Sequence, residues 1–171
     1  MKKRTIVLYC IVAIFLFLFV SLAFLVKQKY KLRRTIENLS DFCLPCTIDS
    51  TLFCSMQIAK DMPVILMYFH PECDLCISKV QQIQQISEMY RDIQWILVSF
   101  AEKDTLMKFA ETYQLTDISN LVVLVDSQLS LYDHLQLASI PAIYIYDRRH
   151  QLAAIKRGSV KFEEIILLAY R

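Results

Sequence analysis

The chain has 171 residues, enough for one domain with a hydrophobic core, and its charge is nearly balanced, with 19 Lys/Arg against 17 Asp/Glu. Residues 1–34 contain eight of the basic side chains and no acidic ones, which leaves eleven basic against 17 acidic residues, a net charge of −6, for 35–171. This charge excludes a basic face for nucleic acid. With one glycine, Gly158, the chain also lacks a glycine-rich loop for nucleotide phosphates.

The first 41 residues predict a membrane anchor with its flanking segments. A short basic N-terminus at 1–4 precedes an uncharged apolar stretch at 5–26, which is long enough to span a hydrocarbon core of about 30 Å as a transmembrane helix. The juxtamembrane linker at 27–41 begins with five Lys/Arg that can meet anionic lipid headgroups. Ser21-Leu22-Ala23 would suit a cleaved signal peptide, but the apolar run continues to Val26, which favours a retained single-pass anchor.

Alternating strand and helix patterns then predict an α/β domain at 42–171, with a central mixed sheet flanked by helices. A hairpin is expected from strands at 46–48 and 51–54 around the turn Asp49-Ser50. The further strands are expected at 63–69, 93–100, 121–125, 140–146 and 151–156. The helices are expected at 77–90, 106–113, 129–137 and 162–170, the last with Ser159 as its N-cap.

The most informative motif is Cys73-Asp74-Leu75-Cys76, at the junction between a buried strand and a helix. A thiol at the N-terminus of a helix lies at the positive end of the helix dipole, which favours its thiolate form. A second thiol one turn later is close enough to close a disulfide with the first. Cys73 and Cys76 are therefore the candidate catalytic pair for thiol–disulfide exchange; the alternative is a structural disulfide or two inert thiols.

A second pair, Cys43-Leu44-Pro45-Cys46, precedes the predicted hairpin without a helix to activate it. We expect a structural Cys43–Cys46 disulfide rather than a second redox pair. Cys54 then makes the cysteine count after the anchor odd, so one thiol stays free or pairs between chains. Four thiols in two such motifs could also bind zinc, but the 26 residues between Cys46 and Cys73 exceed the usual spacing, so no metal site is predicted.

Four features resemble the thioredoxin-like superfamily: the strand before Cys73-x-x-Cys76, the strand opened by Ile140-Pro141, the hairpin that ends at Gly158, and the terminal amphipathic helix. The extra strand at 121–125 is similar to the insertion in membrane-anchored, extracytoplasmic disulfide reductases of bacteria. The resemblance implies that Cys73 is the nucleophile and Cys76 the resolving thiol. It also implies that Pro141 is a cis-proline and that the backbone of Ile140 binds the substrate strand.

The departures from that family concern the reactivity of the site. Glu72 and Asp74 flank Cys73, and their charges are expected to disfavour its thiolate, whereas a protonated His70 would partly offset them. These three residues are predicted to adjust the pKa of the Cys73 thiol, and the higher pKa expected from the two carboxylates favours a reducing couple. Met67 stands where the family has a buried acid, which removes a proton acceptor for Cys76.

Together these features predict a thiol–disulfide oxidoreductase, tethered to the inner (cytoplasmic) membrane, whose domain faces the periplasm or exterior and reduces cysteine-containing protein substrates. Electrons would come from a separate thiol reductant, since no cofactor site is expected. Two alternatives remain open. One is a non-catalytic thioredoxin-like interaction module; the other is a peroxiredoxin-type peroxidase, which ranks last because His70-Pro71-Glu72-Cys73 lacks the Thr or Ser that positions peroxide.

Overall fold

The computed structural model describes residues 13–25, 27, 39 and 41–171. The chain divides into two units, Met1–Thr35 and Ile36–Arg171, and each is described by itself. In the first unit, residues 13–25 are helical, and the remainder of the predicted anchor at 5–26 lies outside the described residues. Among the residues that are described, no helix combines the length and the apolar character needed to span a membrane.

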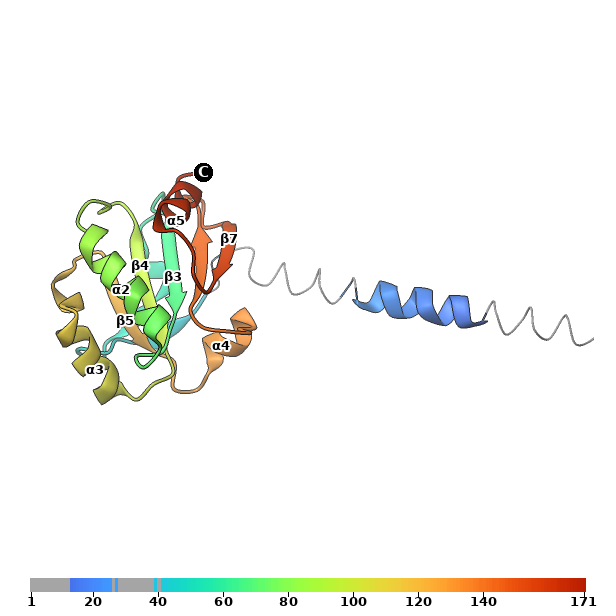
Figure 1. Cartoon of the computed structure of the whole chain (residues 1–171), viewed down its shortest axis with the longest axis horizontal. Helices are drawn as coiled ribbons and strands as arrows, with labels where there is room; N and C mark the ends of the chain where they lie inside the picture. Colours follow the sequence, from blue (N-terminus) through green and yellow to red (C-terminus); the bar gives the residue numbers. More distant parts are fainter. Residues whose placement is uncertain (1–12, 26, 28–38, 40) are drawn as a thin grey trace, which may run out of the picture. The chain divides into compact units, whose positions relative to one another are not determined.

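The second unit is built on a mixed sheet that has five strands within residues 41–171, in the order β5-β4-β3-β6-β7 (Figure 1). Strand β3 lies at its centre, parallel to β4 and antiparallel to β6. The strand bounds are β3 Val64–Tyr68, β4 Gln94–Ser99, β5 Leu121–Val125, β6 Ala142–Tyr146 and β7 Leu152–Arg157. The first three strands are parallel, so their carboxyl ends share one edge of the sheet.

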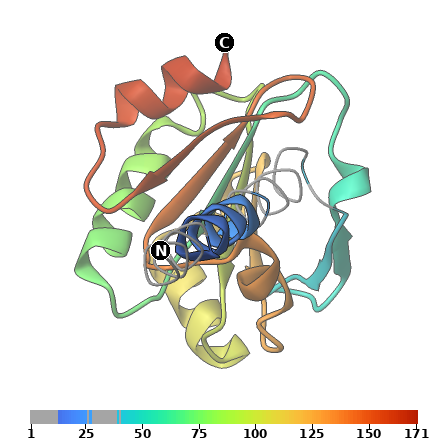
Figure 2. The same ribbon diagram turned by 90° about the vertical axis from the view of Figure 1, so that its right-hand side faces the viewer.

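Helices cover one face of the sheet, and a hairpin with a short helix covers the other (Figure 2). The first face carries α2 (Asp74–Ile86), α3 (Lys103–Thr112) and α5 (Phe162–Ala169). The second face carries β1 (Cys43–Pro45), β2 (Leu52–Cys54), the 3-10 turn η1 (Ser55–Gln57) and α4 (Ser130–Leu135); a further 3-10 turn, η2 (Leu115–Asp117), follows α3. Strand β3 is therefore buried on both sides, which explains why its sequence is apolar without alternation.

The predicted helices and sheet strands are present, with ends shifted by a few residues. The largest shift concerns α2, which ends at Ile86 instead of at residue 90 and starts directly after Cys73 instead of at residue 77. The predicted N-cap of the last helix was wrong: Lys161 occupies that position, without a side-chain capping hydrogen bond, and Ser159 lies two residues earlier. Helix ends are poorly defined by periodicity, because the residues of the first turn need not contribute to the apolar face.

The hairpin needs a larger correction, because its strands are 43–45 and 52–54 and not 46–48 and 51–54. The turn is longer than the predicted Asp49-Ser50 pair: the amide of Cys46 donates to the carbonyl of Thr51 at 2.8 Å and closes a loop of four residues. Thr47 leaves the hairpin, and both its amide and its hydroxyl donate to the carbonyl of Val123 at 2.9 Å. Tertiary contact with β5 therefore sets the point where β1 ends.

Candidate active site

Cys73 occupies the N-cap of α2, at the edge where β3 ends. Strand β3 stops at Tyr68, and a tight turn follows, in which the amide of Cys73 donates to the carbonyl of His70 at 3.1 Å. The Cys73 sulfur accepts the amide of Cys76 at 3.3 Å, as N-cap side chains do. The amide of Cys76 and the positive end of the helix dipole therefore face this sulfur, an arrangement that favours negative charge at a helix N-terminus.

The two thiols of the motif are in contact but differ in exposure. The Cys76 thiol donates to the Cys73 sulfur at 2.7 Å, and neither is in a disulfide, so the structure shows the dithiol. Cys73 is half-buried and reaches solvent, whereas Cys76 is fully buried. Burial, with the hydrogen bond to Cys73, raises the pKa of Cys76 to about 12. Cys73 is therefore the sulfur that is accessible from solvent, and the raised pKa of Cys76 favours its protonated form.

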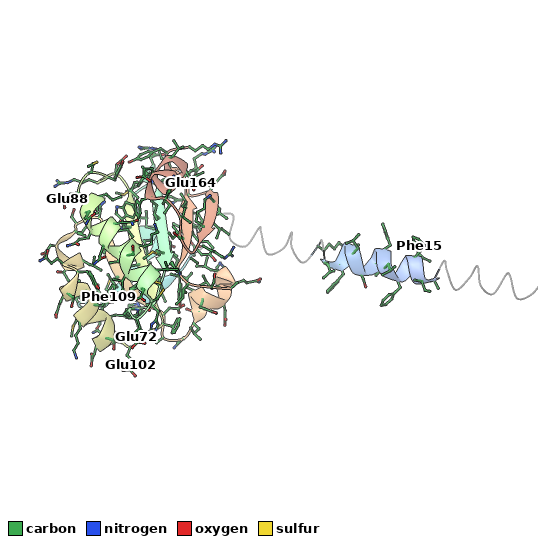
Figure 3. The ribbon with its side chains drawn as sticks, viewed as in Figure 1. Phe15, Glu72, Glu88, Glu102, Phe109 and Glu164 are labelled. Carbon is green, nitrogen blue, oxygen red and sulfur yellow. A yellow bond between two sulfur atoms is a disulfide. The ribbon has the colours of Figure 1, made fainter. Side chains whose placement is uncertain are left out.

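The predicted tuning residues surround Cys73, but at different depths. The Nδ1 atom of His70 accepts the amide of Glu72 at 3.3 Å, and the His70 ring packs 5.2 Å from the ring of Phe100. The side chains of Glu72 and Asp74 are exposed, so water screens their charges from the sulfur. Figure 3 shows Glu72 at the same end of the domain as Glu102, which follows β4. Their effect on Cys73 stays a prediction.

Ile140 and Pro141 lie at the same edge of the sheet as the thiols. Ala142, the first residue of β6, pairs with Tyr68, the last residue of β3, so Pro141 precedes β6 where the chain leaves β3 toward Cys73. The Ile140–Pro141 peptide bond is cis, and the Pro141 carbonyl accepts the amide of Gly158 at 3.1 Å. The topology therefore brings the two segments together, although 66 residues separate Ile140 from Asp74 in the sequence.

The core beneath the thiols contains no acid at position 67, where Met67 is fully buried in one apolar cluster with Cys76.

Helix α2 is fixed to the segment before α5 by a buried lysine, Lys79. Its ammonium donates to the carbonyl of Val160 and, at 3.0 Å, to Gln82, and burial lowers its pKa. The apolar periodicity of the helix gave no indication of this contact, because a lysine does not belong to an apolar pattern even where, as here, it lies on the buried face beside Val80.

Sequence reasoning also missed a buried hydrogen-bond centre at Asp126, directly after β5. Its carboxylate accepts the Tyr68 hydroxyl at 2.8 Å, together with the Ser130 hydroxyl and the amides of Ser130, Leu131 and Tyr132 at the start of α4. Burial and this bond raise the pKa of Tyr68 above its usual range. Tyr68, Phe100 and Tyr132 form an aromatic cluster that extends to His70. The signal in the sequence was an Asp at a strand end, four residues before a Ser.

The predicted Cys43–Cys46 disulfide was wrong, because Cys43 is bonded to Cys54 and Cys46 is a free thiol. Cys43 and Cys46 belong to an extended segment, where three residues span roughly 10 Å, beyond the reach of a disulfide. Cys43 and Cys54 instead face each other directly across β1 and β2, with their Cα atoms 4.0 Å apart. The four thiols of the zinc alternative are thus not brought together, and no metal-binding group of three or more His, Cys, Asp or Glu occurs in the described part of the chain.

Comparison with known proteins supports the fold. No protein-family model and no curated protein matches the chain. Among solved structures, it is similar to a secreted disulfide oxidoreductase of Mycobacterium tuberculosis homologous to Escherichia coli DsbE (14% identity, TM-score 0.65, covering 80% of this chain and 96% of that one). A thioredoxin-family thiol:disulfide interchange protein of Chlorobium tepidum TLS gives 16% identity and a TM-score of 0.66, with 77% and 94% of the two chains covered.

The same fold also occurs in a protein of different activity. The peroxidoxin BcpB of Mycobacterium tuberculosis matches with 14% identity and a TM-score of 0.64, over 77% of this chain and 90% of that one. At these identities the comparisons establish an α/β thioredoxin-like fold and do not choose between activities. The choice rests on the residues of the site.

Proposed function

We propose that the chain is a membrane-tethered thiol–disulfide oxidoreductase that reduces protein disulfides through Cys73 and Cys76. One observation carries the proposal: two thiols in contact at a helix N-terminus, one open to solvent and the other buried with a raised pKa. This asymmetry supplies separate attacking and resolving groups. A structural disulfide would not need a sulfur that is open to solvent at Cys73.

The cycle has two exchange steps. In the first, the Cys73 thiolate attacks one sulfur of a substrate disulfide; a bond from Cys73 to that sulfur forms, the substrate bond breaks, and the other substrate sulfur leaves as a thiolate. In the second, Cys76 loses its proton and attacks Cys73, which releases the second substrate thiol and leaves a Cys73–Cys76 disulfide. A separate thiol reductant then returns the two electrons.

The proton of Cys76 is the difficult point of the second step. With Met67 beneath the site, no buried carboxylate is present at that position to accept it. The departing substrate thiolate or water must accept it instead. In this proposal the backbone of Ile140, near the end of β3 that leads to Cys73, binds the substrate chain while this transfer takes place.

The tether is proposed from the uncharged stretch at 5–26, which has the length of a membrane span and basic residues on both sides. The domain would face the periplasm or exterior, where oxidants make a disulfide reductase useful. Membrane fractionation, followed by labelling of Cys73 with a membrane-impermeant maleimide in intact cells, tests both points. Labelling only after lysis would place the domain on the cytoplasmic side.

Redox titration in dithiothreitol buffers, with disulfides mapped by mass spectrometry, tests the activity. A reversible Cys73–Cys76 couple at low potential supports a reductase, and a high potential indicates an oxidase or isomerase. Cys73→Ser should abolish exchange, whereas Cys76→Ser should trap substrates as mixed disulfides. If the pair never cycles, the interaction-module alternative replaces this proposal.

A further inference from the structure

We propose that the Cys43–Cys54 disulfide is a second thiol-exchange site, which accepts two electrons from external thiols and does not depend on Cys73 and Cys76. It lies on the β1–β2 hairpin, on the opposite face of the sheet from α2 (Figure 2). Cys43 is exposed and Cys54 is half-buried, so the bond is open to solvent. Exposed disulfides are more easily attacked by thiolates than buried ones.

A cavity of about 150 Å³ gives access to Cys43. Its size equals roughly five times the share of one water molecule in the liquid, which is enough for the sulfur and carbons of an incoming thiol. The cavity is lined by Asp41, Phe42, Cys43, Ser130, Leu131 and His134. His134 lines the same cavity as Cys43, and in the proposed exchange its imidazole accepts the proton of the incoming thiol.

The hairpin is held together on both sides of the disulfide. The amide of Ser55 donates to the carbonyl of Phe42 at 2.9 Å on one side, and the amide of Cys46 donates to Thr51 at 2.8 Å on the other. Leu44, between the two bonds, is buried in the core. When the disulfide opens, these contacts keep Cys43 and Cys54 opposite each other, so that the dithiol can be oxidised again without refolding.

The exchange balances with two equivalents of thiol. One thiol gives its proton to His134, and its thiolate attacks the Cys43 sulfur; a mixed disulfide forms and Cys54 leaves as a thiolate, which takes up a proton. A second thiol attacks the external sulfur of the mixed disulfide, so that Cys43 and Cys54 become thiols and the two external thiols leave joined by a disulfide. Small monothiols, or a protein with an accessible cysteine, fit this chemistry.

The rate of reduction tests this site separately from the first. In the full chain carrying Cys73→Ser and Cys76→Ser, 2-mercaptoethanol is added at pH 7, and reduction of Cys43–Cys54 is followed by alkylation and mass spectrometry. Circular dichroism at each time point reports whether the domain stays folded. We expect reduction without unfolding, about tenfold slower in His134→Ala and restored by added imidazole. Cys46→Ser, at the half-buried free thiol directly after β1, is the matched control and should not change the rate.

Two results would overturn the proposal. If the disulfide is reduced only when denaturant unfolds the domain, the bond is a structural clip. If His134→Ala is reduced as fast as the parent chain, the cavity beside Cys43 has no part in the exchange. Because Cys73 and Cys76 are absent from these variants, neither result bears on the activity proposed for that pair.

Discussion

The Cys76 thiol donates a hydrogen bond to the Cys73 sulfur, and of the two side chains only Cys73 reaches solvent. Burial of Cys76 therefore leaves Cys73 as the accessible sulfur of the pair. In the proposed cycle the substrate would meet Cys73 first, and Cys76 would act only when a mixed disulfide had formed beside it. Which group removes the proton of Cys76 then decides how quickly that mixed disulfide is resolved.

The resolving step should accelerate with pH. Burial is the largest cause of the raised Cys76 pKa and does not need a free thiol at Cys73, so with Cys73 in a mixed disulfide the thiolate fraction of Cys76 should still rise from pH 7 to 9. Loading Cys73 with 5-thio-2-nitrobenzoate and following its release at 412 nm measures this step directly. Cys76→Ser is the control and should release no chromophore by the internal route. A rate that levels off below pH 9 would show that burial does not hold the proton.

Met67→Asp should accelerate resolution near neutral pH, because it places a proton acceptor in the cluster that contains Cys76. The same change buries a carboxylate, so the free energy of unfolding should fall by several kcal/mol. Chromophore release and urea denaturation measure the two effects, and Met67→Leu controls for lost packing. If Met67→Asp folds and resolves no faster than Met67→Leu, another group accepts the proton.

Asp126→Asn should lower the free energy of unfolding by about 1–3 kcal/mol, because an amide cannot accept all the hydrogen bonds that both carboxylate oxygens receive. Tyr68→Phe removes one of these bonds and should cost about 1 kcal/mol. Urea denaturation with an unchanged m-value is the measurement. Asp133→Asn, at an exposed position of α4, whose first amides donate to Asp126, is the matched control. Equal stability of the two Asp variants would contradict a stabilising role for Asp126.

Cysteine substitutions in the hairpin should distinguish a Cys43–Cys54 disulfide from a Cys43–Cys46 disulfide. Cys43→Ser and Cys54→Ser should each lower the free energy of unfolding by roughly 2–4 kcal/mol, because each opens the same loop. Cys46→Ser leaves that bond intact and should change stability by less than about 0.5 kcal/mol. Thermal unfolding of the three variants under non-reducing conditions gives the comparison. A large loss in Cys46→Ser would favour the bond from Cys43 to Cys46.

The predictions that held were those with a local cause. Strand β3 could be located because its residues are buried on both faces and therefore uniformly apolar. The position of Cys73 at the start of α2 followed from the change of apolar period at that point. The hairpin register could not be obtained in this way, because one more residue in a turn changes every cross-strand pair. Here Thr47 bonds to β5, lengthens the turn and brings Cys43 opposite Cys54.

By itself, the sequence determined that the chain alternates strands and helices, that an uncharged apolar stretch precedes the domain, and that two thiols begin a helix. Each of these is a property of neighbouring residues, whose spacing and polarity act locally. The tertiary structure alone decided which cysteine pairs with Cys43, that Cys76 is buried while Cys73 is open, and that Asp126 accepts the hydroxyl of Tyr68. Those outcomes depend on contacts between segments far apart in the chain. Sheet register and burial set the distances between such segments, and these distances cannot be calculated from separation in the sequence.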